Sequence, residues 1–174
     1  MSTDSNNIFR GLGIALVTPF SNDGTIDFAS LERLIEYHIN NGADFFCMLA
    51  TTGETPCLSV EERQWIRTFI VEKVNRRKPI VVGLGGNNTE ALVEEIKSFD
   101  FSGIDGILSV CPYYNRPTQE GLYQHFKTIA SATSLPILLY NVPSRTGVNL
   151  DPLTIVRLAT DCRNVIAIKR QVED

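Results

Sequence analysis

The sequence predicts an α/β fold in which mainly parallel strands alternate with helices that pack over them. Six short apolar runs, rich in β-branched residues, have the character of buried strands. They begin about 30 residues apart, which is the size of one strand–helix repeat, and segments with helical periodicity lie between them. With 174 residues and no low-complexity linker, the chain is expected to form a single domain over residues 1–174, whose polar start, residues 1–7, is flexible.

The expected elements follow one another in a regular order. The strands are residues 12–18, 45–49, 80–84, 106–110, 137–141 and 165–169, and the helices are residues 28–40, 59–74, 90–99, 120–133 and 152–160. The first helix carries Leu31, Ile35 and Ile39 at helical spacing.

Local signals mark the starts of two of these helices. Ser59 followed by Glu62 is a capping box, in which each side chain satisfies a backbone N–H at the start of the helix. Asp151 is expected to cap the last helix, and Pro152 suits the first helical turn.

The composition argues against several classes of protein. Apolar residues make up 43% and charged residues 21% of the chain, enough for a sizeable core, and the net charge of −4 disfavours nucleic acid or an acidic membrane as a partner. The start lacks the pattern of a signal peptide, and no apolar run has membrane-spanning length. The four cysteines are widely spaced, so we expect reduced, mostly buried thiols in a cytoplasmic protein. His38 and His125 lie in helix-like stretches and predict no metal site.

Two arrangements of the strands fit the alternation, an open sheet or an eight-stranded (β/α) barrel. An open nucleotide-binding sheet carries a glycine-rich phosphate loop, whereas residues 83–88 (Gly-Leu-Gly-Gly-Asn-Asn) lack the final glycine of that pattern and the lysine of a P-loop. A tight turn into a helix is the better interpretation. Polar residues instead lie at or just after the ends of several strands, at Thr51, Thr52, Tyr113, Tyr114, Tyr140, Asn141 and Lys169. This placement favours a barrel, whose active sites lie at the carboxyl ends of the strands.

Lys169 ends the last apolar run. Because side chains alternate along a strand, Val165, Ala167 and Lys169 are expected to share one face. Inside a closed barrel the amine would lie in dry surroundings, which lower its pKa and make it a nucleophile for carbonyl groups. Taken singly, a lysine at a strand end, paired threonines or paired tyrosines are more often a solvated charge, a turn or packing.

Five motifs occur in order along the chain. They are residues 15–20 (Ala-Leu-Val-Thr-Pro-Phe), 51–54 (Thr-Thr-Gly-Glu), 112–117 (Pro-Tyr-Tyr-Asn-Arg-Pro), 140–147 (Tyr-Asn-Val-Pro-Ser-Arg-Thr-Gly) and 166–169 (Ile-Ala-Ile-Lys). With these motifs the sequence resembles the family of dihydrodipicolinate synthase and N-acetylneuraminate lyase, TIM (β/α)8-barrel enzymes that form a Schiff base. The Ser-Arg-Thr-Gly at the end of the fourth motif favours the synthase branch over the lyases of sugar acids.

The resemblance implies catalytic roles for four residues. Lys169 matches the lysine that condenses with the ketone of pyruvate, and Tyr140 matches the tyrosine that passes protons to and from the imine. Thr51 matches the threonine that links this phenol to a second tyrosine. Tyr114 matches that second tyrosine, which the family lends to the site of a neighbouring subunit.

The resemblance also implies binding roles and a reaction. Thr52 would bind the carboxylate of pyruvate, Arg145 would bind the carboxylate of aspartate semialdehyde, and Tyr113 would lie at a subunit interface. The expected protein is a cytoplasmic homodimer or homotetramer of lysine and diaminopimelate biosynthesis, with small-molecule substrates, no metal or organic cofactor, no nucleic acid and no membrane. The alternatives are a pyruvate-dependent sugar-acid lyase, acting on N-acetylneuraminate or a 2-keto-3-deoxy acid, or an inactive truncated fragment.

The sequence departs from the family pattern after Lys169. The family continues Glu-Ala, whereas this chain continues with residues 170–174 (Arg-Gln-Val-Glu-Asp) and carries about six βα units of the eight. We expect a truncated or frame-shifted reading of a full enzyme, in preference to a fragment completed by a partner or a non-catalytic remnant. An open edge would expose Val165, Ala167 and Lys169 to water, so the chain alone is expected to be poorly soluble and inactive.

A second departure concerns feedback inhibition by lysine, which some family members show. Those enzymes use an acidic side chain early in the third helix and histidines early in the second. This sequence has Ala91 at the acidic position and Val60 and Arg63 at the histidine positions. We therefore expect weak or no inhibition by lysine.

Overall fold

The computed structural model describes residues 8–171, so the expectation that residues 1–7 are flexible lies outside the described residues. The chain divides into two compact units. The first unit is Met1–Gly83 with Phe101–Asp105, and the second is Leu84–Asp100 with Gly106–Asp174. The single domain expected from the sequence stays a prediction.

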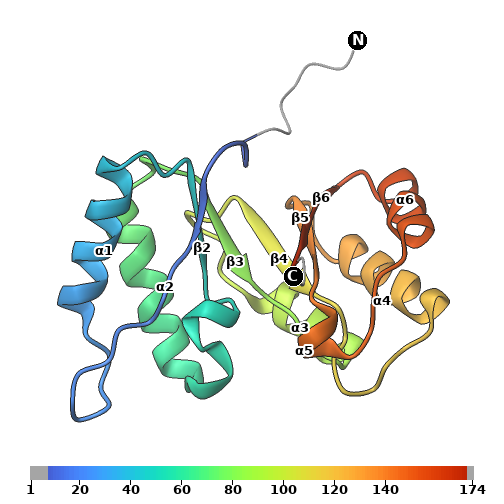
Figure 1. Ribbon diagram of the computed structural model, residues 1–174, viewed down its shortest axis with the longest axis horizontal. Coiled ribbons are helices and arrows are strands. Elements are labelled where there is room, and N and C mark those ends of the chain that lie inside the picture. Colours follow the sequence, from blue (N-terminus) through green and yellow to red (C-terminus); the bar gives the residue numbers. More distant parts are fainter. Residues whose placement is uncertain (1–7, 172–174) are drawn as a thin grey trace. The chain divides into compact units, whose positions relative to one another are not determined.

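The first unit contains three parallel strands, β1 (Gly13–Ala15), β2 (Phe45–Met48) and β3 (Ile80–Gly83), which lie side by side in chain order. Helices α1 (Phe28–Asn40) and α2 (Val60–Val74) pack against each other beside these strands (Figure 1). Two short 3-10 turns, η1 (Thr51–Gly53) and η2 (Thr55–Cys57), connect β2 to α2. The unit therefore has the expected strand–helix alternation.

The capping box predicted at the start of α2 is confirmed. The Ser59 hydroxyl accepts a hydrogen bond from the Glu62 amide at 3.1 Å, and the Glu62 carboxylate accepts one from the Ser59 amide at 2.8 Å. In α1, Leu31 and Ile35 are fully buried, as their helical spacing predicts.

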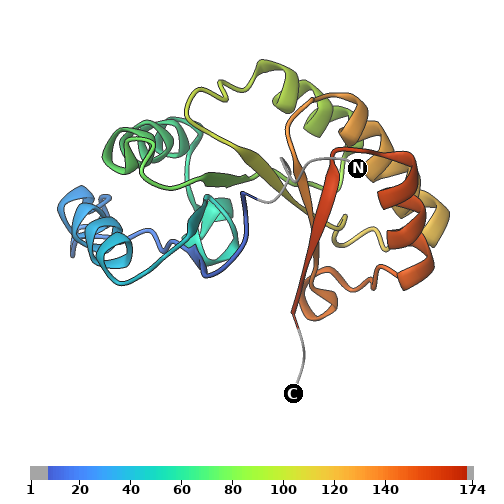
Figure 2. The same cartoon turned by 90° about the horizontal axis from the view of Figure 1, so that it is seen from above.

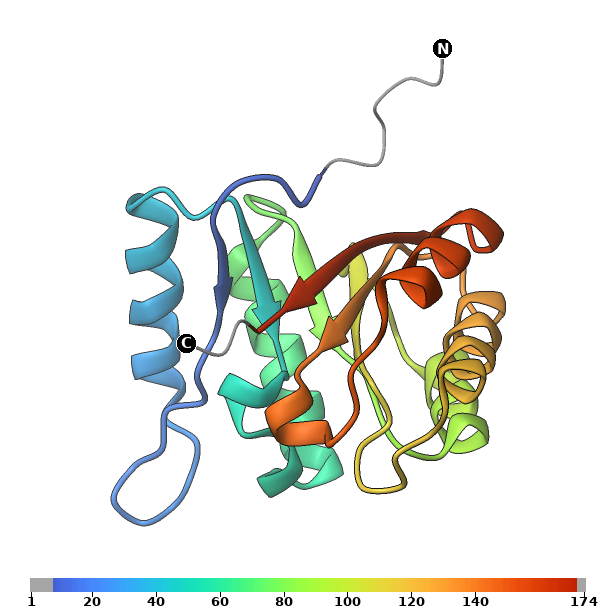
Figure 3. The ribbon, with the colours of Figure 1, turned by 45° about the vertical axis from the view of Figure 1, so that its right-hand side comes forward.

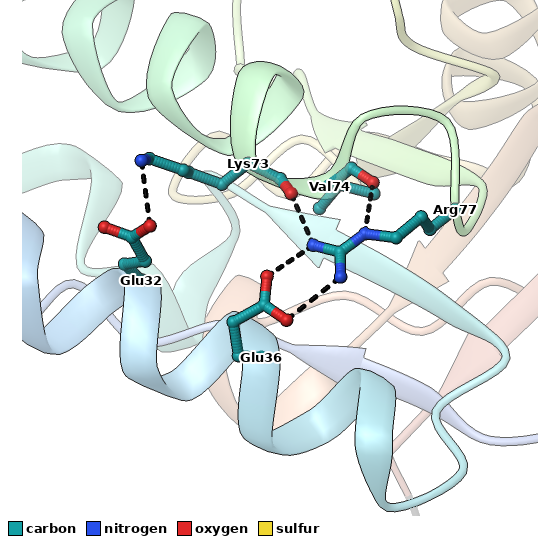
Figure 4. A network of polar contacts seen from close by, with 5 residues as sticks. All are labelled: Glu32, Glu36, Lys73, Val74 and Arg77. Carbon is teal, nitrogen blue, oxygen red and sulfur yellow. Dashed lines mark hydrogen bonds and ion pairs between the residues drawn. The ribbon is translucent and has the colours of Figure 1, made fainter.

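Charged side chains join the end of α2 to α1 (Figure 4). The Arg77 guanidinium donates to the Val74 carbonyl at 3.1 Å and to the Lys73 carbonyl at 2.6 Å, two groups that the end of a helix leaves without intrahelical partners. It also binds both carboxylate oxygens of Glu36, and Lys73 pairs with Glu32 at 2.8 Å. The hydrogen bond from Arg77 lowers the pKa of the Glu36 carboxyl. The network fixes α1 against the loop that leads into β3.

The second unit contains three further parallel strands, β4 (Gly106–Val110), β5 (Ile137–Asn141) and β6 (Val165–Arg170), again adjacent in chain order (Figure 3). Its helices are α3 (Thr89–Ser98), α4 (Gln119–Ser131), α5 (Pro143–Thr146) and α6 (Pro152–Asp161). Helices α4 and α6 pack together, and α6 also contacts β6, so these two helices cover one face of the strands (Figure 2). No helix within residues 8–171 is long and apolar enough to cross a membrane.

The predicted bounds differ from the structure mainly at the first strand. Residues 106–110 and 137–141 form strands as expected, and Pro152 begins α6 with Asp151 at the N-cap. The Asp151 side chain, however, makes no capping hydrogen bond. The strand expected over residues 12–18 is limited to Gly13–Ala15, because the chain then turns and the Thr18 hydroxyl donates to the Gly53 carbonyl instead of lying in a ladder.

A β-bulge in β6 corrects one prediction about the faces of this strand. Ile137 pairs with Val165, but the next residue, Leu138, pairs with Ala167, so Ile166 is left over. Ile137 and Leu138 are neighbours in β5, so their side chains point to opposite faces of the sheet. Paired residues share a face, so Val165 and Ala167 also lie on opposite faces. The expectation that Val165 shares a face with Lys169, and is exposed with it, is wrong, since Val165 is buried. Ala167 is exposed, as expected.

Three of the four cysteines are buried, as expected. Cys57, in η2, is the exposed one. The glycine-rich stretch after β3 is a turn into α3, where the Asn88 side chain accepts a hydrogen bond from the Ala91 amide, so the structure supports the interpretation as a helix start.

Candidate active site

The structure brings Lys169 and Tyr140 together. The two residues are partners in the register of β5 and β6, and the Lys169 amine lies 4.8 Å from the centre of the Tyr140 ring. This distance is within the range of a cation–π contact. The tyrosine is 6% exposed, whereas the lysine is open to solvent. An amine that a carbonyl compound can reach therefore lies beside the ring of a buried tyrosine.

The strands explain why this pair forms. All five residues of β5, Ile-Leu-Leu-Tyr-Asn, are buried, which fixes the Tyr140 backbone on both sides. After the bulge, Ala167 pairs with Leu138 and Lys169 with Tyr140, so the lysine and tyrosine share one face. The exposure of Lys169 agrees with the expectation for a lysine on an edge strand.

Tyr114 occupies a strained turn. The Asn115 amide donates to the Tyr113 carbonyl at 2.8 Å across Tyr114, whose φ is 72°, and these are the marks of the rare γ-turn with positive φ. An aromatic residue in this region costs about 1–3 kcal/mol and persists only where its surroundings impose it. The Tyr114 side chain is 89% exposed and projects away from its own unit.

Two asparagines impose that turn. The Asn87 side chain donates to the Tyr113 carbonyl, and the Asn115 side chain donates to the Asn87 carbonyl, each at 3.2 Å. The turn is thereby tied to the segment before α3, within the second unit. This fixed, outward position of Tyr113 and Tyr114 is compatible with contact between subunits, which stays a prediction.

Arg145 lies on the short helix α5, which the sequence reasoning did not predict. The Arg145 and Thr146 amides both donate to the Val142 carbonyl at 3.0 Å, and Gly147 closes the turn with a φ of 73°. The guanidinium is exposed, so it is free to bind an anion. Arg116 packs against Gly147 so closely that a Cβ atom there would lie 2.9 Å from its Nε.

Thr51 and Thr52 lie on η1, in the first unit. Both are exposed, and the turn is anchored by the Thr18 hydroxyl, which donates to the Gly53 carbonyl at 2.7 Å, and by the Thr55 hydroxyl, which donates to the Ala50 carbonyl at 3.0 Å. The proton relay expected from Thr51 to Tyr140 and Tyr114 joins residues of both units and stays a prediction, as does the role of Thr52.

Asn141 belongs to the fourth motif, but the sequence reasoning assigned it no role. Its side chain is buried at the end of β5 and makes three polar contacts described below. An amide directly after an apolar run and a candidate catalytic tyrosine is the signal that could have identified it.

The buried thiol of Cys111 is not a competing nucleophile. Burial raises the pKa of Cys111 to about 12, so the group remains a neutral thiol at physiological pH. Within residues 8–171, no cluster of three or more His, Cys, Asp or Glu side chains could hold a metal ion.

Comparison with known proteins shows the family of the chain. Residues 8–174 match the model of the dihydrodipicolinate synthetase family. The 4-hydroxy-tetrahydrodipicolinate synthase of Azobacteroides pseudotrichonymphae is 56% identical over 162 residues, which cover 93% of this chain and 55% of that protein. The chain thus spans about half the length of the curated relatives it matches.

Solved structures agree with the sequence match. Dihydrodipicolinate synthase from Thermotoga maritima superposes with a TM-score of 0.91 at 47% identity, over 96% of this chain and 56% of that one. The chloride-inhibited enzyme from Acinetobacter baumannii, solved in complex with pyruvate, has a TM-score of 0.88 at 47% identity, over 93% and 55% of the two chains. The predicted fold class, an α/β chain of the TIM-barrel type with about six of the eight βα units, is confirmed.

Proposed function

The chain belongs to the dihydrodipicolinate synthetase family, and from that membership we propose that the protein condenses pyruvate with L-aspartate-4-semialdehyde. The product would be 4-hydroxy-tetrahydrodipicolinate, on the route to lysine and diaminopimelate. The observation that carries the proposal is the pairing of the Lys169 amine with the Tyr140 phenol on one strand face. The names of the relatives support the synthase rather than a sugar-acid lyase.

Imine formation needs an amine and a proton shuttle. The free amine of Lys169 adds to the keto carbon of pyruvate, and the carbinolamine then loses its hydroxyl as water when a proton is supplied. Tyr140, whose ring centre lies 4.8 Å from the Lys169 amine, would give and take these protons. Thr51 and Tyr114 would connect the phenol to solvent, and Thr52 would bind the pyruvate carboxylate through its hydroxyl and backbone.

Carbon–carbon bond formation follows from the imine. Its protonated nitrogen draws electrons, so the methyl group loses a proton and becomes an enamine carbon, which attacks the aldehyde of the second substrate. The amino group of that substrate then attacks the imine carbon, closes the ring and releases Lys169. Arg145, exposed on α5, would bind the second substrate's carboxylate with its planar guanidinium.

Trapping of the imine tests the proposal. The protein is incubated with pyruvate, reduced with sodium borohydride, and weighed by intact mass spectrometry, and the modified peptide is then mapped. We expect one reduced pyruvyl group on Lys169. Lys169→Arg should abolish the adduct, whereas Lys97→Arg, a matched change on the exposed face of α3, should leave it unchanged. An unmodified protein, or an adduct on another lysine, would refute the proposal.

The same trap separates the active protein from an inactive fragment. Ala167 and Lys169 are both exposed, which favours slow imine formation in this chain. A Lys169 adduct that forms as slowly as adducts on other exposed lysines would support the inactive alternative.

Further properties are proposed on narrower grounds. A homodimer or homotetramer would use the outward-facing Tyr113 and Tyr114 at its interface. The four free thiols fit the reducing environment of the cytoplasm. Weak or no inhibition by lysine is proposed, because Ala91 replaces the acidic residue and Val60 and Arg63 replace the histidines of the family members that lysine inhibits.

A further inference from the structure

Asn141 joins three segments of the second unit. Its side-chain amide donates to the Asn149 side-chain oxygen at 2.8 Å, and its side-chain oxygen accepts from the Leu150 amide at 3.1 Å. The Cys111 thiol, at the end of β4, lies 4.0 Å from the same oxygen. The Asn141 carbonyl accepts from the Gln171 amide, two residues after Lys169.

These contacts close the segment that carries Arg145. The Arg145 loop, residues 142–150, leaves β5 directly after Asn141 and returns to the Asn141 side chain at its other end. Inside the loop, the Thr146 hydroxyl oxygen lies 3.1 Å from the Val142 carbonyl oxygen and 3.0 Å from the Val148 carbonyl oxygen, so it can donate to either. Both ends are therefore fixed to one residue of the strand, and the short helix α5 is held between them.

The contacts are buried, so losing them has a cost. Asn141 and Leu150 are each 1% exposed. Removing the Asn141 side-chain oxygen would leave the Leu150 amide without its acceptor in a site that water does not reach, whereas Asn149 is exposed and can be changed without opening the core.

We propose that Asn141 is a positioning residue, which fixes the Arg145 loop to the strand of Tyr140 so that Arg145 meets the carboxylate of the second substrate. The proposal rests on the proposed function. Asn141 touches no reacting atom; it acts through the loop. Its loss should therefore weaken use of the aldehyde while leaving pyruvate binding to Lys169 and Tyr140 nearly intact.

Two variants and one control test this role. Asn149→Ala removes the acceptor of the Asn141 amide from an exposed position, and Asn141→Ser shortens the buried side chain. Asn164→Ala is the matched control. Its side-chain nitrogen lies within 3.3 Å of the Ala130, Thr133 and Leu135 carbonyl oxygens at the opposite end of β6, so the substitution weakens the same unit without touching the Arg145 loop.

The first measurement is hydrogen–deuterium exchange of the amides in residues 142–150. We expect faster exchange in Asn149→Ala and Asn141→Ser, and exchange at the wild-type rate in Asn164→Ala. Unchanged exchange in both loop variants would overturn the proposal without reference to any activity.

The second measurement uses the borohydride trap twice. One titration gives the pyruvate concentration for half-maximal adduct on Lys169. The other gives the concentration of aspartate semialdehyde that halves that adduct, because the aldehyde consumes the enamine. In the loop variants we expect the aldehyde concentration to rise about three- to tenfold, the effect of one hydrogen bond, with the pyruvate concentration nearly unchanged.

The outcomes separate the two proposals. Equal increases for both substrates, or none for either, would overturn the role of Asn141 while the adduct itself upholds the proposed function. A wild-type protein with no Lys169 adduct would refute the proposed function, and the link from Asn141 to a substrate carboxylate would fall with it.

Discussion

Acid should destabilise the second unit through His125. This histidine is buried in α4, and its Nδ1 lies 2.8 Å from the Thr89 hydroxyl at the start of α3. Its Nε2 is buried without a partner. We assign the proton of the neutral ring to Nδ1, which donates to Thr89, because a proton on Nε2 would find no acceptor.

The magnitude follows from the pKa. Burial lowers the pKa of His125 from 6.5 to about 4. The unfolded chain therefore takes up the proton near pH 6.5, while the folded protein resists it until about pH 4, so the free energy of unfolding falls as the pH is lowered through this interval. At about 1.36 kcal/mol per pKa unit, the full loss is about 3 kcal/mol, reached near pH 4 and absent above pH 7.

Urea unfolding between pH 7.5 and pH 4.5 measures this loss. His125→Asn is the control, because its amide can still meet the Thr89 hydroxyl and does not titrate. The difference in the free energy of unfolding between the two proteins should move by about 2–3 kcal/mol in favour of the variant as the pH falls. Parallel pH profiles would show that His125 is hydrated or paired in solution, and would refute the reasoning.

Three further changes test other parts of the structure. Gly83→Ala should destabilise the first unit by about 1–3 kcal/mol in urea unfolding. The added Cβ would lie 2.2 Å from the Leu49 carbonyl oxygen, which belongs to the backbone and cannot move aside. Unchanged stability would contradict this close approach. Ser59→Ala should lower the free energy of unfolding by about 1 kcal/mol, because it removes one half of the capping box. Ser98→Ala, near the end of α3, is the control, and equal effects of the two substitutions would argue against the capping box. In native protein, a thiol reagent should modify Cys57 first, and equally fast labelling of the buried cysteines would show that the core is open.

The sequence predicts elements well where burial alone decides them. The bounds of β5 follow from an uninterrupted apolar run, and the start of α2 follows from two polar residues at fixed spacing. The bulge at Ile166 could not be predicted, because the run from Val165 to Ile168 is apolar on both faces and gives no sign of a slip in register.

The candidate site divides in the same way. The motifs indicate Lys169, Tyr140 and Arg145 by their residue types. Helix α5 could not be predicted, because a single turn of four residues has no periodic signal. The hydrogen-bond partners of Asn141 could not be predicted either, because Asn149 and Leu150 come near it only when the chain folds back. Hydrogen bonds of a buried amide depend on tertiary contacts that no local pattern encodes.

Because of the bulge in β6, the direction of the Lys169 side chain does not depend on the exact number of residues before it. In a regular strand, gaining or losing one residue moves every following side chain to the other face of the sheet. In β6 the surplus residue is absorbed between Val165 and Ala167, before the register with Leu138 and Tyr140 resumes. One residue could therefore be removed at this point, and the pairing of Lys169 with Tyr140 would be kept.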